Sequence, residues 1–295
     1  MPGGRGPQIG ARLIVASFRE RNDRKPRSDD TRKPHGDKGF RKGPRTPQAG
    51  KQDFEGWIWG RHAVEAALLN RERTGAMRLV ATQNAAKDLE PVIARSGRAL
   101  RVEPVEAHDL NRMLPPGASH QGMALRTQPL EGVGLHDLVE NGPGVIVMLD
   151  QLTDPQNVGA IFRSAAAFGA KGVVLQDRNS PQLSGALAKA AAGAIERVPC
   201  ARVVNLSRAL EQLADMGWRA VGLDGSAEET LEEALDERPT VLVMGSEGEG
   251  LRRLVAEHCD TLAKIPMPGE FESLNVSNAA AVALYEASRR HNRNA

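Results

Sequence analysis

The 295-residue sequence has few cysteines, few aromatic residues and no long apolar runs. Cys200 and Cys259 have no second cysteine or histidine at metal-ligand spacing, which argues against a disulfide framework and a structural zinc site. Apolar runs such as Gly144 to Leu149 fall far short of the roughly 20 residues of a membrane-spanning helix. The apolar run near the N-terminus is also too short for a secretory signal. We therefore expect a cytoplasmic protein with no metal and no membrane contact.

The composition indicates a soluble protein with a substantial core, because 40% of the residues are apolar and 26% are charged. The length suggests two domains. The formal net charge of +2 hides an uneven distribution. Residues 1–52 contain 14 Lys and Arg against 5 Asp and Glu, together with eight Gly and six Pro. We expect this segment to be a disordered basic tail that either contacts RNA phosphates or is a solvated extension.

The segment 53–128 has the pattern of a small α/β domain. Its expected strands are Trp57 to Trp59, Met77 to Thr82, Leu100 to Pro104 and Gly122 to Arg126, and its expected helices are His62 to Asn70, Asp88 to Ser96 and His108 to Leu114. Gly and Pro residues over 129–143 predict a linker to a second domain.

The segment 144–295 alternates between strand and helix patterns again. Its expected strands are Val145 to Leu149, Gly172 to Leu175, Val203 to Val204, Arg219 to Leu223, Val241 to Met244 and Leu262 to Pro266, and its expected helices are Val158 to Phe168, Gln182 to Glu196, Leu206 to Met216, Leu251 to His258 and Val276 to Arg290. This alternation predicts a parallel sheet covered on both faces, with ligands at the carboxyl ends of its strands. Function is expected in the loops after Leu149, Met244 and Ile265.

The first of these loops, Asp150 to Asn157, leads into a helix with an apolar stripe and places Asn157 where we expect the N-cap. Arg163 lies five residues after Val158, the first stripe position, and therefore about 140° around the helix from it. It points away from the core, toward either solvent or a site, and solvent is the ordinary interpretation of a single exposed arginine. The loop lacks a glycine turn, which argues against a dinucleotide-dependent oxidoreductase.

The second loop, Gly245 to Gly250, has the sequence GSEGEG, and its glycines allow a ligand to approach the backbone closely. The spacing differs from the GxGxxG fingerprint, and two glutamates would repel a pyrophosphate at the start of a helix. The carboxylates suit a positively charged ligand or a hydroxyl or amine donor, or they only favour the helix dipole. The third loop, residues 265–278, contains two prolines and Ser and Asn caps, and its free backbone groups can bind a purine or an amino-acid moiety.

Together these loops resemble the SpoU (TrmH-type) branch of the SPOUT superfamily, the RNA ribose 2′-O-methyltransferases. The resemblance rests on Asn157 and Arg163 in the sequence NVGAIFRSA, on Gly245 to Gly250, and on Ser273 to Ser277 with the sequence SLNVS, in that order. The region from Trp57 to Arg126 resembles the L30e-like substrate-binding domain that the large-subunit rRNA enzymes of this branch carry.

The resemblance implies a C-terminal SPOUT domain with a deep trefoil knot, a homodimer, and S-adenosylmethionine as the cofactor. By position, Gly245, Ile265 and Leu274 match the cofactor-binding residues of the family. The residues that match those around the transferred methyl group, and that we predict to be catalytic, are Arg163, Asn157, Glu247, Ser273 and Asn275.

Methyl transfer to a ribose 2′-OH requires positioning of the oxygen and removal of its proton. A guanidinium stays protonated in proteins, so our hypothesis is that Arg163 binds the target phosphate and stabilises the developing oxyanion, although family proposals also let it accept the proton. In this hypothesis Glu247 and Asn275 orient Arg163 and Asn157, and Ser273 holds the ribose or its phosphate.

The predicted function is S-adenosylmethionine-dependent methylation of the ribose 2′-OH of a nucleotide, a guanosine by resemblance, in 23S rRNA. One alternative is a tRNA ribose 2′-O-methyltransferase, which would lack the N-terminal domain. The other is a non-catalytic RNA-binding ribosome-assembly factor, against which the intact Asn157, Arg163 and Glu247 argue. Arg61, Arg71 and Arg73 either face RNA or belong to the ordinary surface.

Overall fold

The structure is a computed structural model that describes residues 54–140, 142–268 and 274–291. The predicted basic tail, residues 1–52, lies outside the described residues, which all belong to one compact unit. Within these three ranges no helix is long and apolar enough to cross a membrane. The same ranges contain no cluster of three or more His, Cys, Asp or Glu side chains that could hold a metal ion.

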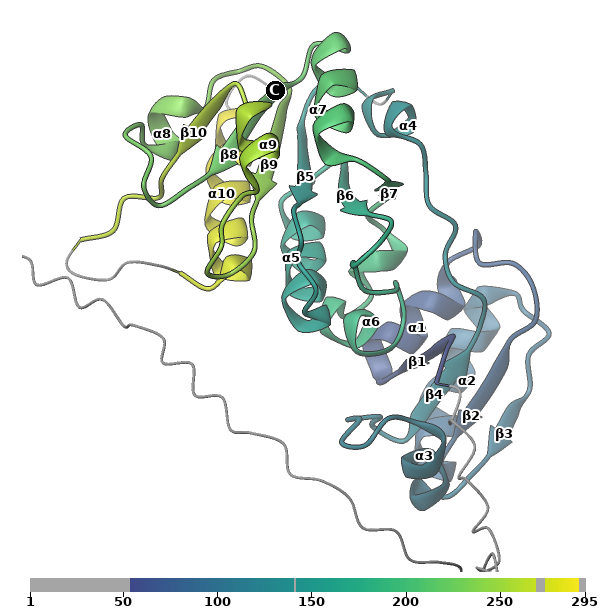
Figure 1. The fold of residues 1–295 in the computed structure, drawn as a ribbon. Helices are drawn as coiled ribbons and strands as arrows, with labels where there is room; N and C mark the ends of the chain where they lie inside the picture. The colour runs from purple at the N-terminus through teal and green to yellow at the C-terminus, as the bar shows by residue number, and fades with distance from the viewer. Residues whose placement is uncertain (1–53, 141, 269–273, 292–295) are drawn as a thin grey trace, which may run out of the picture. The chain divides into compact units, whose positions relative to one another are not determined.

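A four-stranded sheet in the order β1-β4-β2-β3 forms the first domain (Figure 1). Its elements are β1 (Trp57–Trp59), α1 (Arg61–Leu69), β2 (Arg78–Ala81), α2 (Gln83–Ser96), β3 (Val102–Pro104), α3 (Ala107–Met113) and β4 (Met123–Arg126). Helices α1 and α2 share one core cluster with the sheet, whereas α3 packs with Trp57 and Trp59 in another. Helix α2 begins earlier than predicted because buried Ala85 extends its apolar stripe back into the first turn.

A six-stranded sheet in the order β10-β8-β9-β5-β6-β7 forms the second domain, and every pairing in it is parallel (Figure 1). Its strands are β5 (Val145–Leu149), β6 (Gly172–Gln176), β7 (Cys200–Val203), β8 (Arg219–Leu223), β9 (Thr240–Met244) and β10 (Thr261–Ala263). This arrangement confirms the predicted parallel α/β sheet. The trefoil knot stays a prediction.

Helices cover both faces of the parallel sheet. Successive strand residues point to opposite sides, and in β5 all of them are buried, so both faces need a covering layer. The helices of this domain are α4 (Leu135–Val139), α5 (Pro155–Ala167), α6 (Gly185–Ala191), α7 (Leu206–Asp215), α8 (Leu231–Ala234), α9 (Arg253–Glu257) and α10 (Val276–His291). In β5, Val147 belongs to the core cluster that contains α5, α6, α8 and α10. Ile146 and Met148 belong to the cluster that contains α4, α7 and α9. The result is a three-layer α/β/α domain.

The structure differs from the predicted elements at three places. The expected linker contains α4, whose Leu138 is buried, so apolar packing orders part of a stretch that Gly and Pro mark as a loop. The expected helix Gln182 to Glu196 is instead α6 followed by a short 3-10 helix, Ala194–Glu196, because Ala192 and Gly193 adopt left-handed backbone conformations. Helix α8 was not predicted, although Thr230 and Glu233 form a capping box at its start.

Arg73 is buried, which corrects the expectation that it faces RNA or solvent. Its Nε and Nη2 donate to the carboxylate of Glu196 at 2.8–3.0 Å, and the two side chains are only 2% and 3% exposed. Nη1 donates to the carbonyl oxygen of Gln128, and the Asn70 amide also donates to Glu196. Arg73 is therefore a structural residue that joins the first domain to the 3-10 helix of the second.

Helix α5 follows the first functional loop, and it packs closely on α6 at Gly159. A Cβ atom at this position would lie 2.6 Å from Ala190 Cβ and 2.6 Å from the carbonyl oxygen of Leu187. Because a backbone oxygen cannot move away easily, the two helices can keep this separation only with glycine at residue 159.

We therefore expect Gly159→Ala to lower the free energy of unfolding by about 1–3 kcal/mol through overpacking, in spite of the better helix propensity of alanine. Urea denaturation followed by circular dichroism measures this change. The matched control is Ala166→Ser on the exposed side of α5, for which we expect a loss of about half a kcal/mol. An equal stability of Gly159→Ala and the wild type would contradict close packing at this contact.

Candidate active site

Helix α5, which follows the loop after β5, begins earlier than predicted. Asp154, not Asn157, is the N-cap: its carboxylate accepts the backbone N–H groups of Gln156 at 3.1 Å and Asn157 at 3.2 Å. Pro155 occupies the first helical position, where its fixed φ favours a helix start. The expected N-cap role of Asn157 is therefore wrong. Its side chain is not needed for capping and is available for other contacts.

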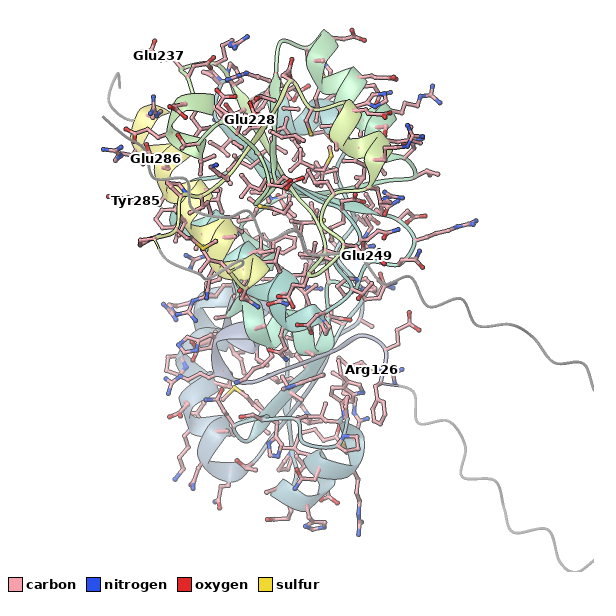
Figure 2. All side chains as sticks on the ribbon, turned by 60° about the vertical axis from the view of Figure 1, so that its left-hand side comes forward. Arg126, Glu228, Glu237, Glu249, Tyr285 and Glu286 are labelled. Atoms are coloured by element: carbon pink, nitrogen blue, oxygen red, sulfur yellow. The ribbon has the colours of Figure 1, made fainter. Side chains whose placement is uncertain are left out.

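The loop after β9 is a tight turn rather than the start of a helix. Ser246 and Gly250 exchange two backbone hydrogen bonds, of 3.1 and 3.0 Å, across its base. A Cβ at Gly245 would lie 2.1 Å from the carbonyl carbon of Gly250, so only glycine fits there. Gly248 and Gly250 both have positive φ angles. The turn holds Glu247 near its tip, and Figure 2 marks exposed Glu249 on the same turn.

The side chains of Asn157, Glu247 and Asn275 form one hydrogen-bonded group. Glu247 Oε1 accepts from Asn157 Nδ2 at 3.2 Å and from Asn275 Nδ2 at 2.7 Å. Asn275 Nδ2 also donates to Asn157 Oδ1 at 3.0 Å, and the N–H of Val276 donates to Glu247 Oε1 at 3.4 Å. The structure thus brings together three of the five predicted catalytic residues, one from each functional loop.

Arg163 lies outside this group. It is exposed on α5, six residues after Asn157 and so about 9 Å farther along the helix axis. Within the part of the chain that the structure describes, Arg163 makes no hydrogen bond or ion pair, and Glu247 and Asn275 contact Asn157 instead. Ser273, the fifth predicted residue, lies outside the described residues.

A cavity of about 790 Å³ lies at the carboxyl ends of β8, β9 and β10. All three predicted cofactor-binding residues, Gly245, Ile265 and Leu274, line this cavity. Its wall combines apolar side chains, among them Leu223, Met244 and Ala279, with three carboxylates and one ammonium group, those of Asp224, Glu247, Glu249 and Lys264. The volume is within the roughly 300–1,000 Å³ of small-molecule sites. Apolar walls suit an adenine ring and carboxylates suit a sulfonium or ammonium group, so the cavity fits S-adenosylmethionine.

The two cysteines take no part in this site. Burial raises the pKa of both the Cys200 and the Cys259 thiol to about 12. Both thiols therefore stay protonated at neutral pH, and a protonated thiol is a poor nucleophile and a poor metal ligand.

The fold and the site together define an α/β protein that binds a small ligand beside a cluster of polar side chains, and family models identify it further. Residues 144–285 match the family described as "SpoU rRNA Methylase family". Residues 57–133 match the family described as "RNA 2'-O ribose methyltransferase substrate binding".

Two relatives agree with these matches. A protein of Mycolicibacterium gilvum named as an uncharacterized tRNA/rRNA methyltransferase is 38% identical over 295 residues, covering 97% of this chain and 93% of that protein. A relative from Mycolicibacterium smegmatis with a similar name is 50% identical over 147 residues, covering 50% of this chain and 47% of the relative.

Solved structures are also similar. The SpoU methyltransferase AviRb of Streptomyces viridochromogenes, in complex with the cofactor AdoMet, has a TM-score of 0.65 and 25% identity, covering 79% of this chain and 89% of that one. An AdoMet-bound rRNA methyltransferase of Sinorhizobium meliloti has a TM-score of 0.65 and 26% identity over 79% and 86% of the two chains. The chain belongs to the SpoU family of S-adenosylmethionine-dependent RNA methyltransferases, which confirms the predicted family and enzyme class.

The hydrogen-bonded group predicts the effect of Glu247→Gln. Glutamine keeps the shape of the side chain but replaces charge-assisted hydrogen bonds with neutral ones, which are weaker by roughly 1 kcal/mol each. We expect methyl transfer to RNA to slow by about tenfold or more. The affinity for S-adenosylmethionine should change by less than about threefold, because Asp224 and Glu249 keep their negative charges in the cavity wall. Single-turnover kinetics and calorimetry measure the two quantities.

The matched control for this prediction is Glu257→Gln, which removes an exposed carboxylate that pairs with Arg253 on α9. We expect it to leave both quantities unchanged. A Glu247→Gln variant with the transfer rate of the wild type would show that the carboxylate charge does not position Asn157.

Proposed function

We propose that the protein transfers a methyl group from S-adenosylmethionine to the ribose 2′-OH of a nucleotide in 23S rRNA, a guanosine by family resemblance. The observation that supports this most directly is the contact of Asn157, Glu247 and Asn275 beside the cavity that Gly245, Ile265 and Leu274 line. This arrangement provides a cofactor cavity and fixed polar groups at one edge of the sheet.

Each part of the site has a role in this reaction. The cofactor supplies an electrophilic methyl group on a positively charged sulfur. Backbone groups around Gly245 and Ile265 hold the cofactor, and the nearby carboxylates favour its positive charge. Asn157, held by Glu247, is rigid enough to orient the ribose. Exposed Arg163 binds the phosphate next to that ribose and stabilises the charge that develops on the 2′-oxygen.

The N-terminal domain supports large-subunit rRNA as the substrate. Residues 57–133 match an RNA 2′-O-ribose methyltransferase substrate-binding domain, and a tRNA enzyme of the family is not expected to need it. The catalytic domain argues against a non-catalytic assembly factor, because such a protein would not need the hydrogen-bonded side chains of Asn157, Glu247 and Asn275.

A homodimer is part of this proposal. Val282 and Tyr285 of α10 are 42% and 55% exposed, although both are large apolar residues. Figure 2 shows Tyr285 on the outer side of α10, and its ring contacts that of Phe168 edge-on with a centroid separation of 5.8 Å. Leu274, which lines the cavity, is also 40% exposed. A second copy packed on this face would cover the apolar residues and stand close to the cofactor cavity.

The experiment that tests the function uses purified protein, methyl-labelled S-adenosylmethionine and unmodified 23S rRNA, 16S rRNA and tRNA. We expect label only in 23S rRNA, retained in alkali-resistant dinucleotides, because a 2′-O-methyl group prevents alkaline cleavage. Label in tRNA would establish the tRNA alternative instead. Cofactor binding without label in any RNA, including ribosome-assembly intermediates, would indicate an assembly factor.

Replacing Arg163 by Lys tests how this residue acts. Lysine keeps the positive charge but cannot form the two parallel hydrogen bonds of a guanidinium with a phosphate. We expect the transfer rate to fall by about tenfold or more at saturating cofactor, with cofactor affinity unchanged. A near-normal rate for Arg163→Lys would exclude bidentate binding, and Arg253→Lys on exposed α9 is the matched control.

A further inference from the structure

Asp150 and Arg252 form an ion pair that is separate from the predicted catalytic residues. The Asp150 side chain is fully buried, with 0% exposure, and its Oδ1 lies 2.7 Å from both Nε and Nη2 of Arg252. Its Oδ2 accepts the backbone N–H of Arg252 at 2.9 Å. The backbone N–H of Asp150 donates to the carbonyl oxygen of Met244 at 2.8 Å.

These bonds place Asp150 at the base of the turn that carries Glu247. Met244 is the last residue of β9 and directly precedes the turn, and Arg252 lies just after the end of the turn at Gly250. Asp150 therefore contacts the chain on both sides of the turn. Because Asp150 is also the first residue after β5, it joins the turn to the loop that leads to Asn157.

Stability alone does not account for this pair. The Asp150 carboxylate is fully buried and has a large desolvation cost, whereas the Arg252 side chain is 40% exposed, so that solvent partly screens its attraction to Asp150. The next residue, Gln151, has a φ of 56°, which is unfavourable for a residue other than glycine. A buried charge and a strained backbone side by side are typical of sites where a precise geometry matters more than stability.

We propose that Asp150 and Arg252 are positioning residues, whose ion pair holds the turn from Gly245 to Gly250 in the shape that forms the cavity wall and keeps Glu247 against Asn157. The effect on the cavity wall is independent of the RNA substrate. The effect on methyl transfer rests on the proposed function.

The test compares Arg252→Met, which removes the charge and the side-chain hydrogen bonds but keeps the backbone N–H bond to Asp150, with Arg252→Lys, which keeps the charge. Asp150→Asn changes the other partner with little change of shape. The matched control is Arg253→Met, which removes the neighbouring arginine and its ion pair with Glu257, whose side chains are 77% and 51% exposed. Each variant is studied as the full chain, well below its unfolding temperature.

Hydrogen exchange gives a local measurement, because the N–H groups of Ser246 and Gly250 close the turn. In Arg252→Met and Asp150→Asn we expect these two amides to exchange about tenfold faster or more, with amides of β5 unchanged. We expect S-adenosylmethionine to bind about fivefold more weakly, and Arg252→Lys to restore most of both losses. Arg253→Met should resemble the wild type.

Unchanged exchange at Ser246 and Gly250 together with unchanged cofactor affinity in Arg252→Met would overturn the proposal. A lower unfolding temperature without these local changes would also overturn it, since it would indicate a purely structural pair. If the wild type methylates no RNA, the proposed function fails, but exchange and cofactor affinity still decide the role of the ion pair.

Discussion

The candidate active site depends on one carboxylate oxygen, Glu247 Oε1, which accepts three hydrogen bonds from two other segments of the chain. The parallel register makes this possible. Leu149 at the end of β5 is paired with Met244 at the end of β9, so the loops that follow these strands begin side by side. A short glycine turn then suffices to bring Glu247 to Asn157. The N-terminus of α10 completes the contact through Asn275, whose Oδ1 in turn accepts from Ser277.

The sequence predicted elements whose apolar pattern is long enough to show a period. The bounds of β5 and β8 agree with the prediction, because buried parallel strands form continuous apolar runs. Helices α4 and α8 have only four or five residues, less than two turns, so their periodicity is not visible. The start of α5 was wrong because Asp154 and Asn157 are both good N-caps, and Pro155 decides between them.

The site was predictable to the extent that its residues lie in recognisable motifs. Asn157, Glu247 and Asn275 were found through the resemblance, and their mutual contacts follow from the topology of a parallel sheet. Asp150 was noticed only as part of a loop without a glycine turn. Its partner Arg252 is 102 positions away, and no periodicity or spacing connects two residues at such a separation. The contact of Arg252 with the buried Asp150 carboxylate identifies the pair, and this contact is visible only in the folded chain.

Asn157 and Arg163 share α5 but differ in how they are held. Asn157 is fixed on two sides by side-chain hydrogen bonds, and close packing at Gly159 fixes the helix that carries it. Such a group can orient a ligand at little entropic cost when the ligand binds. Arg163 is exposed and has no partner among the described residues, so in the proposed reaction an RNA phosphate would fix its side chain. In the proposed function the helix therefore combines a fixed amide group for the ribose with an exposed cation for the RNA phosphate.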